Sequence, residues 1–177
     1  MDLVGYPHEV IVSDAAETLP EGIGSAEGAA EISRRKAAAV LDATTGERVI
    51  VAADTVVESD GETFGKPKDA ADAERMLRAM SGGVHFVHTG LTVTDGERTV
   101  TKCVTTKVYM RSLSDGEIEG YIKSGEPFDK AGAYGIQGIA GAFVERLEGD
   151  YFNVMGLPLC TLSEILSDLG IGLFECE

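Results

Sequence analysis

An acidic residue at the end of an apolar run is the first candidate for chemistry. Asp54 follows the apolar run Val49–Ala53, whose length is typical of a buried strand. Burying an unpaired carboxylate costs roughly a few kcal/mol, so such an acid is expected to be paired, metal-bound or solvated. Lys66 lies on the return arm of a hairpin turned by Asp60-Gly61. An acid and a lysine on adjacent elements suit a phosphate ester and its divalent metal, and a solvated acid beside a surface lysine is the alternative.

A second lysine stands on the apolar face of a predicted helix. The helix is expected to run from Ser25, as its cap, to about Ala43. Its apolar face has helical spacing, but Lys36 interrupts it. Lys36 either extends along the edge of the core to reach solvent or points into a cleft.

The overall charge limits the partners of the chain. The 177 residues include 15 Lys and Arg against 30 Asp and Glu, which gives a formal net charge of −15. A broad basic surface for nucleic acid is therefore excluded, and any site for a polyanion must be a local positive pocket. The three cysteines show no metal or redox spacing, and neither a signal peptide nor a membrane span is evident. These features predict a cytoplasmic protein without membrane partners.

The remaining pattern predicts a mixed α/β or α+β fold. Capping signals predict helices that begin at Asp69, with Asp72 three residues later, and at Ser114, with Glu117 three residues later. The other expected elements are strands at His8–Ser13, Val84–Thr94 and Arg98–Met110, an Asp95-Gly96 turn, and a last helix from Pro158 to Leu169.

Residues 131–144 carry no charge and have a glycine at every third position from Gly132 to Gly141. Such a stretch lets the backbone approach a ligand or a neighbouring strand closely. Tyr134 could stack on a base or pack in the core. Gln137 could read a base edge with its carboxamide or satisfy a loop backbone.

Other chemistries have little support. His85 and His88 face opposite sides of one predicted strand, and with His8 they are interpreted as structural or surface residues. Neither a G-x-S-x-G motif nor zinc spacing occurs. Pro67 stands where a Walker A loop needs a hydroxyl, so kinase-type chemistry is disfavoured.

Several motifs together resemble the Maf nucleotide pyrophosphatases, from about Leu3 to Leu169. They are Ala53-Asp54-Thr55-Val56-Val57, Gly65-Lys66-Pro67-Lys68-Asp69, Ser81-Gly82, Leu113-Ser114-Asp115, Gly125-Glu126-Pro127, Asp129–Gly138, Gly149-Asp150-Tyr151 and Val154–Pro158. The resemblance implies a single domain over residues 1–177, related to the inosine triphosphate pyrophosphatases, with two lobes around a central cleft. It also implies hydrolysis of nucleoside triphosphates to the monophosphate and pyrophosphate with a divalent metal, Mg²⁺ or Mn²⁺.

The same resemblance assigns expected roles. Asp54 matches the family's proton acceptor and is a candidate metal ligand, while Lys36 and Lys66 match its phosphate-binding lysines. Thr55 and Gln137 match the branch that prefers dTTP and UTP. The expected substrates are therefore these two triphosphates or modified pyrimidine triphosphates. A 7-methyl-GTP pyrophosphatase, which typically has glutamine in place of that threonine, is one alternative.

The sequence departs from the family pattern in two places. Family members carry Ser-x-Ser-Pro-Arg-Arg before the segment that corresponds to residues 3–7, whereas this sequence starts at Met1. Ala16 stands where relatives have an acid, next to Glu17. These departures motivate a second alternative, a catalytically weak nucleotide-binding regulator of cell division or nucleotide pools. The oligomeric state stays open, a homodimer included.

Overall fold

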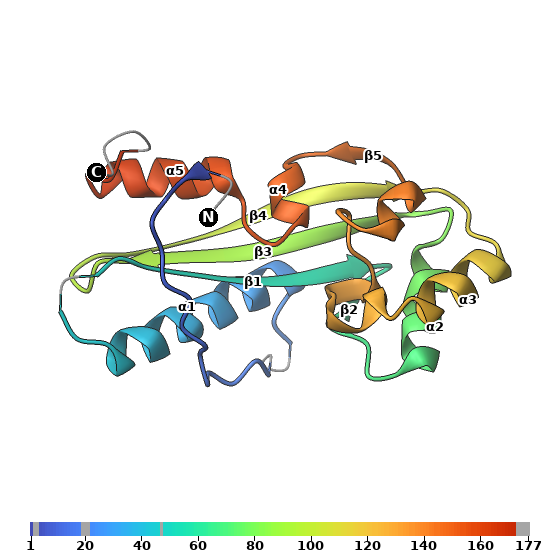
Figure 1. Cartoon of the computed structure of the whole chain (residues 1–177), viewed down its shortest axis with the longest axis horizontal. Helices are drawn as coiled ribbons and strands as arrows, with labels where there is room; N and C mark the ends of the chain where they lie inside the picture. Colours follow the sequence, from blue (N-terminus) through green and yellow to red (C-terminus); the bar gives the residue numbers. More distant parts are fainter. Residues whose placement is uncertain (2–3, 19–21, 47, 173–177) are drawn as a thin grey trace.

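A long antiparallel sheet forms the centre of this computed structural model, which describes residues 1, 4–18, 22–46 and 48–172 (Figure 1). The strand order is β2-β1-β3-β4-β5, and every neighbouring pair is antiparallel. The strands are β1 (Ile50–Ser59), β2 (Glu62–Phe64), β3 (Val84–Thr94), β4 (Thr99–Met110) and β5 (Val144–Glu148). The predicted mixture of helices and strands is therefore organised around an antiparallel sheet.

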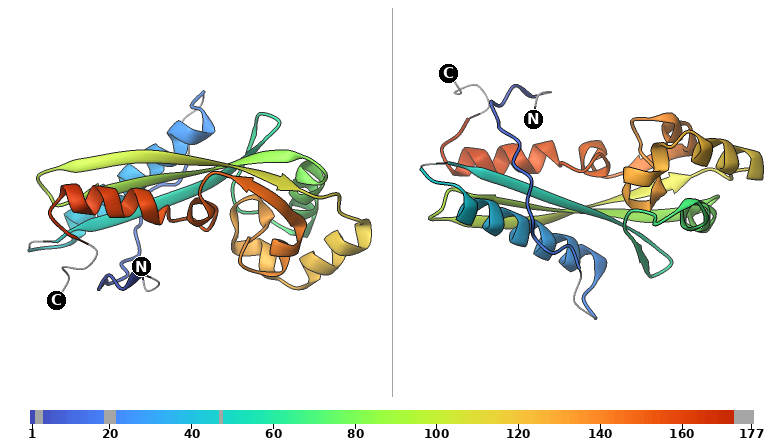
Figure 2. Two further views of the ribbon diagram at one scale, coloured as in Figure 1. Left: turned by 90° about the horizontal axis from the view of Figure 1, so that it is seen from above. Right: turned by 60° about the horizontal axis from the view of Figure 1, so that its bottom comes forward.

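Helices cover the two ends of this sheet differently. They are α1 (Ser25–Ala43), α2 (Ala70–Met80), α3 (Asp115–Lys123), α4 (Tyr151–Val154) and α5 (Leu159–Asp168), with short 3₁₀ segments η2 (Glu126–Asp129), η3 (Ala131–Ala133) and η4 (Ile139–Phe143). At one end α1 and α5 lie on opposite faces of the sheet, while α2, α3 and the 3₁₀ segments gather at the other end (Figures 1 and 2). Two separate apolar clusters match this division, one around Leu77 and Ile118 and one around Leu91 and Leu162. The expected two-lobed arrangement is present.

One glycine determines how closely α1 approaches the sheet. Gly90 of β3 pairs with Asp54 of β1, and a Cβ at position 90 would lie 2.2 Å from the Ala29 carbonyl oxygen. Only glycine allows this approach, because a larger residue would collide with the helix backbone. Ala29 and Ile32 are consequently buried under the sheet. The close packing brings the next turn of α1, with Lys36, beside Asp54.

Most of the local signals in the sequence are confirmed. Ser114 and Glu117 form a reciprocal capping box at the start of α3. Asp69 caps α2 by accepting a hydrogen bond from the Asp72 N–H, but the Asp72 carboxylate accepts from the Lys68 N–H instead of the cap residue. Asp60, at φ 50°, and the glycine after it turn the β1–β2 hairpin.

Two expectations about the N-terminal part are wrong. Residues 8–13 form no strand; the segment crosses β1 instead of running alongside it, and Val10 and Val12 remain more than four-fifths exposed (Figure 1). A short run of β-branched residues alone does not create a strand where no neighbouring strand supplies hydrogen bonds. Ser25 does not cap α1 either. Gly24 occupies the cap, and the Ser25 hydroxyl bonds Thr63 Oγ1 at 2.6 Å.

Two further expectations concern the cysteines and the membrane. Cys103 and Cys160 are both free thiols, and Cys176 lies outside the described residues. Within the part of the chain that the structure describes, no helix has the length and apolar character needed to cross a bilayer.

Candidate active site

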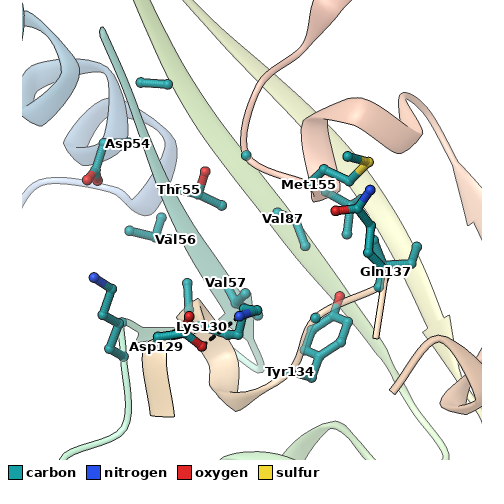
Figure 3. Close-up of a pocket in the computed structure, with 18 of the residues that line it drawn as sticks. Asp54, Thr55, Val56, Val57, Val87, Asp129, Lys130, Tyr134, Gln137 and Met155 are labelled. Carbon is teal, nitrogen blue, oxygen red and sulfur yellow. Dashed lines mark hydrogen bonds and ion pairs between the residues drawn. The ribbon is translucent and has the colours of Figure 1, made fainter. Parts of the chain in front are cut away.

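A pocket of about 790 Å³ opens beside β1, between α1 and residues 126–138. Asp54 and Thr55 rise from β1, while Gln137 and Met155 lie next to each other on another wall (Figure 3). The structure thus brings all five predicted site residues to one cavity: Lys36, Asp54, Thr55, Lys66 and Gln137.

At the α1 side of the pocket, one lysine joins two carboxylates. Lys36 Nζ lies 2.8 Å from Asp54 Oδ1 and 2.7 Å from Glu17 Oε1. The Asp54 and Lys36 side chains are only 12% and 20% exposed, whereas Glu17 is 60% exposed. Lys36 therefore points into the cleft, and the interpretation that it extends to solvent is wrong.

The surroundings alter the proton affinity of these groups. Burial raises the pKa of Asp54, and this outweighs the hydrogen bond and charge of Lys36, which lower it. For Lys36, burial acts to lower the pKa, but the bonds to Asp54 and Glu17 outweigh it and the pKa is raised. The hydrogen bond from Lys36 lowers the pKa of Glu17. The lysine is thus held as a cation, while Asp54 is a better proton acceptor than an exposed aspartate.

The second predicted lysine is positioned by the glycine-rich segment. The Gly132 N–H donates to the Gly65 carbonyl at 3.0 Å, which ties the loop that carries Lys66 to this segment. Gly132 has φ 68°, and a Cβ there would lie 2.8 Å from Val57 Cγ2. The glycine therefore lets the loop pack directly on β1. Lys66 itself is exposed and lines the pocket.

At the other side of the pocket the candidate base-reading residues differ in burial. Thr55 is half-buried on β1, and its Oγ1 lies 2.9 Å from Thr89 Oγ1. Gln137 is exposed in the loop between η3 and η4. Tyr134 is buried, with its hydroxyl 2.8 Å from His85 Nε2. It packs in the core and also lines the pocket, so the structure shows the packing role, and stacking on a base stays a prediction.

Sequence reasoning missed a carboxylate that shapes the loop carrying Gln137. Glu126 accepts hydrogen bonds from the Tyr121 hydroxyl at 2.9 Å and from the Ile139 N–H at 3.0 Å. A Cβ on Gly138 would lie 2.2 Å from Glu126 Oε1, so the glycine makes room for this brace. The only signal was the Gly125-Glu126-Pro127 motif, whose role could not be read without the loop geometry.

The formal charge of the pocket differs from expectation. Three lysines and four carboxylates line it: Lys36, Lys66 and Lys130 against Glu17, Asp54, Glu126 and Asp129. The prediction of a locally positive pocket is therefore wrong, because the carboxylates that line the pocket outnumber the lysines. Per residue, the lining is still less acidic than the chain as a whole, with a formal charge of −1 against −15 for the 177 residues.

The donor set suits a divalent cation that arrives with phosphates. Asp54 and Glu17 both contact the same Lys36 Nζ, so their carboxylates converge on one point. No group of three or more His, Cys, Asp or Glu with metal-site geometry occurs among the described residues. Mg²⁺ is usually held by one or two carboxylates together with substrate phosphates, so two carboxylates are sufficient for such a site.

Comparison with known proteins agrees with this geometry. The model of the Maf-like protein family matches residues 1–169. A dTTP/UTP pyrophosphatase of Chromobacterium violaceum is 48% identical over 177 residues, which are 98% of this chain and 89% of that protein. Proteins of the same name from Geotalea uraniireducens and Vibrio cholerae are 46% and 44% identical, over 94% and 92% of this chain and 86% and 87% of their own lengths. The chain belongs to the Maf family.

Proposed function

We propose that this protein hydrolyses dTTP and UTP, and modified pyrimidine triphosphates of the same shape, to the monophosphate and pyrophosphate. One observation carries the proposal: a desolvated Asp54 bonded to Lys36 shares a pocket with Thr55 and Gln137. The names of the relatives support the same activity. We place the reaction in the cytoplasm, where free thiols such as Cys103 and Cys160 stay reduced.

In this mechanism the residues divide between phosphates and base. Lys36 has three N–H donors, of which two contact carboxylates, so one remains for a phosphate oxygen. Lys66 supplies a second cation from the hairpin side. Both lysines neutralise charge that moves onto the departing pyrophosphate. The nucleotide thus lies along the pocket, with its phosphates toward the lysines and its base toward Thr55 and Gln137.

Asp54 is the proton acceptor. Its Oδ1 is occupied by Lys36, and among the described residues Oδ2 has no hydrogen-bond partner. Oδ2 can therefore take a proton from a water molecule as the water oxygen bonds to phosphorus and the α–β phosphoanhydride bond breaks. A general base of this kind contributes about 10²–10⁴-fold to the rate.

We further propose that a divalent cation, Mg²⁺ or Mn²⁺, is held by Asp54 and Glu17 together with the phosphates. When bound, such a cation neutralises phosphate charge and polarises the phosphoryl group. Removal of Glu17 should raise the Mg²⁺ or Mn²⁺ concentration needed for half-maximal rate without affecting the choice of base.

Base selection is assigned to Thr55 and Gln137. Uracil and thymine present an N–H donor between two carbonyl acceptors, and a carboxamide with a hydroxyl can match this pattern. A bound base with another pattern covers these polar groups without pairing them, which costs on the order of 1–3 kcal/mol for each group.

The test is the identity of the product across a panel of triphosphates with Mg²⁺ or Mn²⁺. Release of pyrophosphate, fastest from dTTP and UTP, supports the proposal. Release of single phosphate contradicts the chemistry, while preference for 7-methyl-GTP contradicts the choice of base. If the protein binds dTTP in the presence of metal and leaves the dTTP intact over hours, it is a nucleotide-binding regulator.

A further inference from the structure

The hydroxyl of Thr55 is connected to a second, fully buried hydroxyl behind it. Thr55 Oγ1 and Thr89 Oγ1 lie 2.9 Å apart across the β1–β3 pairing, where the two residues are direct partners. Thr89 is 0% exposed, and its Oγ1 donates to the Asn153 carbonyl oxygen at 2.9 Å. The three groups form a chain from the segment after β5, through β3, to the pocket wall.

This chain determines which way the Thr55 proton points. A threonine hydroxyl has one proton and two lone pairs. The Thr89 proton is used on the Asn153 carbonyl; turning it away would leave two acceptor oxygens 2.9 Å apart with no proton between them. Because Thr89 has no access to water, only Thr55 can supply the proton between the two hydroxyls. Thr55 therefore donates to Thr89 and offers only lone pairs to other partners.

The pocket leaves those lone pairs accessible. Thr55 lines the pocket, and Figure 3 shows its side chain between Asp54 and Val87 on the sheet that forms one wall. Gly156 faces the same hydroxyl, and a Cβ there would lie 3.4 Å from Thr55 Oγ1. Gly156 also has φ 100°, which disfavours any side chain at this position. The glycine thus keeps the space over Thr55 open.

We infer that Thr89 is a positioning residue for base specificity, which makes Thr55 an acceptor that reads a ring N–H. The inference rests on the proposed function and names how the pocket separates two pyrimidines. Uracil and thymine carry a hydrogen on N3, whereas cytosine has a lone pair there. An acceptor held in one orientation binds the first and repels the second, because two lone pairs then face each other.

The test is the ratio of kcat/KM for UTP to that for CTP, two substrates with identical sugar and phosphates. Thr89→Val keeps the shape but removes the acceptor for the Thr55 proton, so that proton can turn into the pocket. The ratio is expected to fall about tenfold, as for the loss of one hydrogen-bond match. Thr89→Ser restores the hydroxyl and should keep the ratio within about threefold of the parent.

A matched control uses the next buried threonine of the same strand. Thr92 is also 0% exposed, and its hydroxyl contacts Ser33 and Thr101 away from the pocket. Thr92→Val should lower the melting temperature without moving the UTP to CTP ratio. Thr89→Val is expected to fold, since the Asn153 carbonyl still accepts from the Gly156 N–H at 3.0 Å.

A second variant tests the proposal even if Thr89→Val does not fold. Thr55→Val removes the reading oxygen itself and should lower the ratio at least as much, with no further fall when both valines are combined. An unchanged ratio in Thr55→Val, or an equal loss for UTP and CTP in Thr89→Val, overturns the inference. Failure of the parent protein to release pyrophosphate from UTP would instead contradict the proposed function.

Discussion

Replacing Asp54 by asparagine separates the chemical role of this residue from its structural role. Asparagine keeps the size of the side chain and a carbonyl oxygen that can accept the 2.8 Å hydrogen bond from Lys36. It removes the negative charge and the capacity to take a proton. The substitution therefore leaves the contact with Lys36 in place while it eliminates the proposed base and weakens the proposed cation site, which the saturating Mg²⁺ of the assay offsets.

Rate and stability should respond in opposite directions. Loss of a general base is expected to lower kcat for dTTP by about 10²–10⁴-fold, or about 3–5 kcal/mol in the barrier. Burial raises the pKa of Asp54, so the folded state binds this proton more tightly than the unfolded state. The stability of the folded protein therefore falls as the pH rises from the pKa of Asp54 in the unfolded state through its higher pKa in the folded state. At pH 8 the melting temperature of Asp54→Asn should equal or exceed that of the parent.

The assay pairs pyrophosphate release from dTTP at saturating Mg²⁺ with thermal unfolding in the same buffer. Glu58→Gln is a matched control, because it makes the same charge change on β1 at a residue outside the pocket. Its rate should remain within about threefold of the parent. If the Asp54→Asn variant hydrolysed dTTP as fast as this control, Asp54 would not be the general base. A parallel loss of rate and melting temperature would make Asp54 a structural acid.

Four further outcomes are expected. Lys66→Met should lower kcat/KM for dTTP by about 10- to 100-fold, as for loss of a charged hydrogen bond, with little change in melting temperature. Gln137→Ala should lower kcat/KM for dTTP and UTP about tenfold more than for purine triphosphates, whereas an equal loss would place Gln137 on the sugar or phosphates. Chelation of divalent metal should abolish pyrophosphate release, and added Mg²⁺ or Mn²⁺ should restore it. Burial lowers the pKa of His85 from 6.5 to about 4, so its contribution to stability is complete above pH 6.5 and is lost as the pH falls toward 4. The loss should be about 2 kcal/mol between pH 7 and 5, and chemical denaturation of His85→Gln should show a flatter profile.

Features set by neighbouring residues in the chain were predictable from the sequence. The capping box of Ser114 and Glu117 and the Asp60-Gly61 turn depend on groups only a few residues apart, and both are present. The His8–Ser13 strand failed because a strand needs a partner elsewhere in the chain, and no local pattern identifies one. The segment does contain β-branched apolar residues, but its two valines are exposed to solvent.

The candidate site shows the same limit. The helical stripe containing Lys36 left two directions open, and the choice depends on how Gly90 lets α1 approach β1. Thr89 carried no signal, since a threonine in a β-rich run is ordinary. Its role follows from the register that places it opposite Thr55 and from the carbonyl of Asn153 behind it. Such contacts join residues that are 34 and 64 positions apart.

The charge balance of the pocket bears on how so acidic a protein accepts a polyanion. Lys36 directs two of its donors at Asp54 and Glu17, and the four carboxylates outnumber the three lysines. A bare triphosphate would therefore meet net repulsion. Once the two carboxylates have a divalent cation as partner, Lys36 can turn more of its donors toward the phosphates. A monophosphate has fewer oxygens to share with that cation, so it gains less from its presence. We therefore expect added Mg²⁺ to strengthen binding of UTP much more than binding of UMP, which would favour release of the product after cleavage.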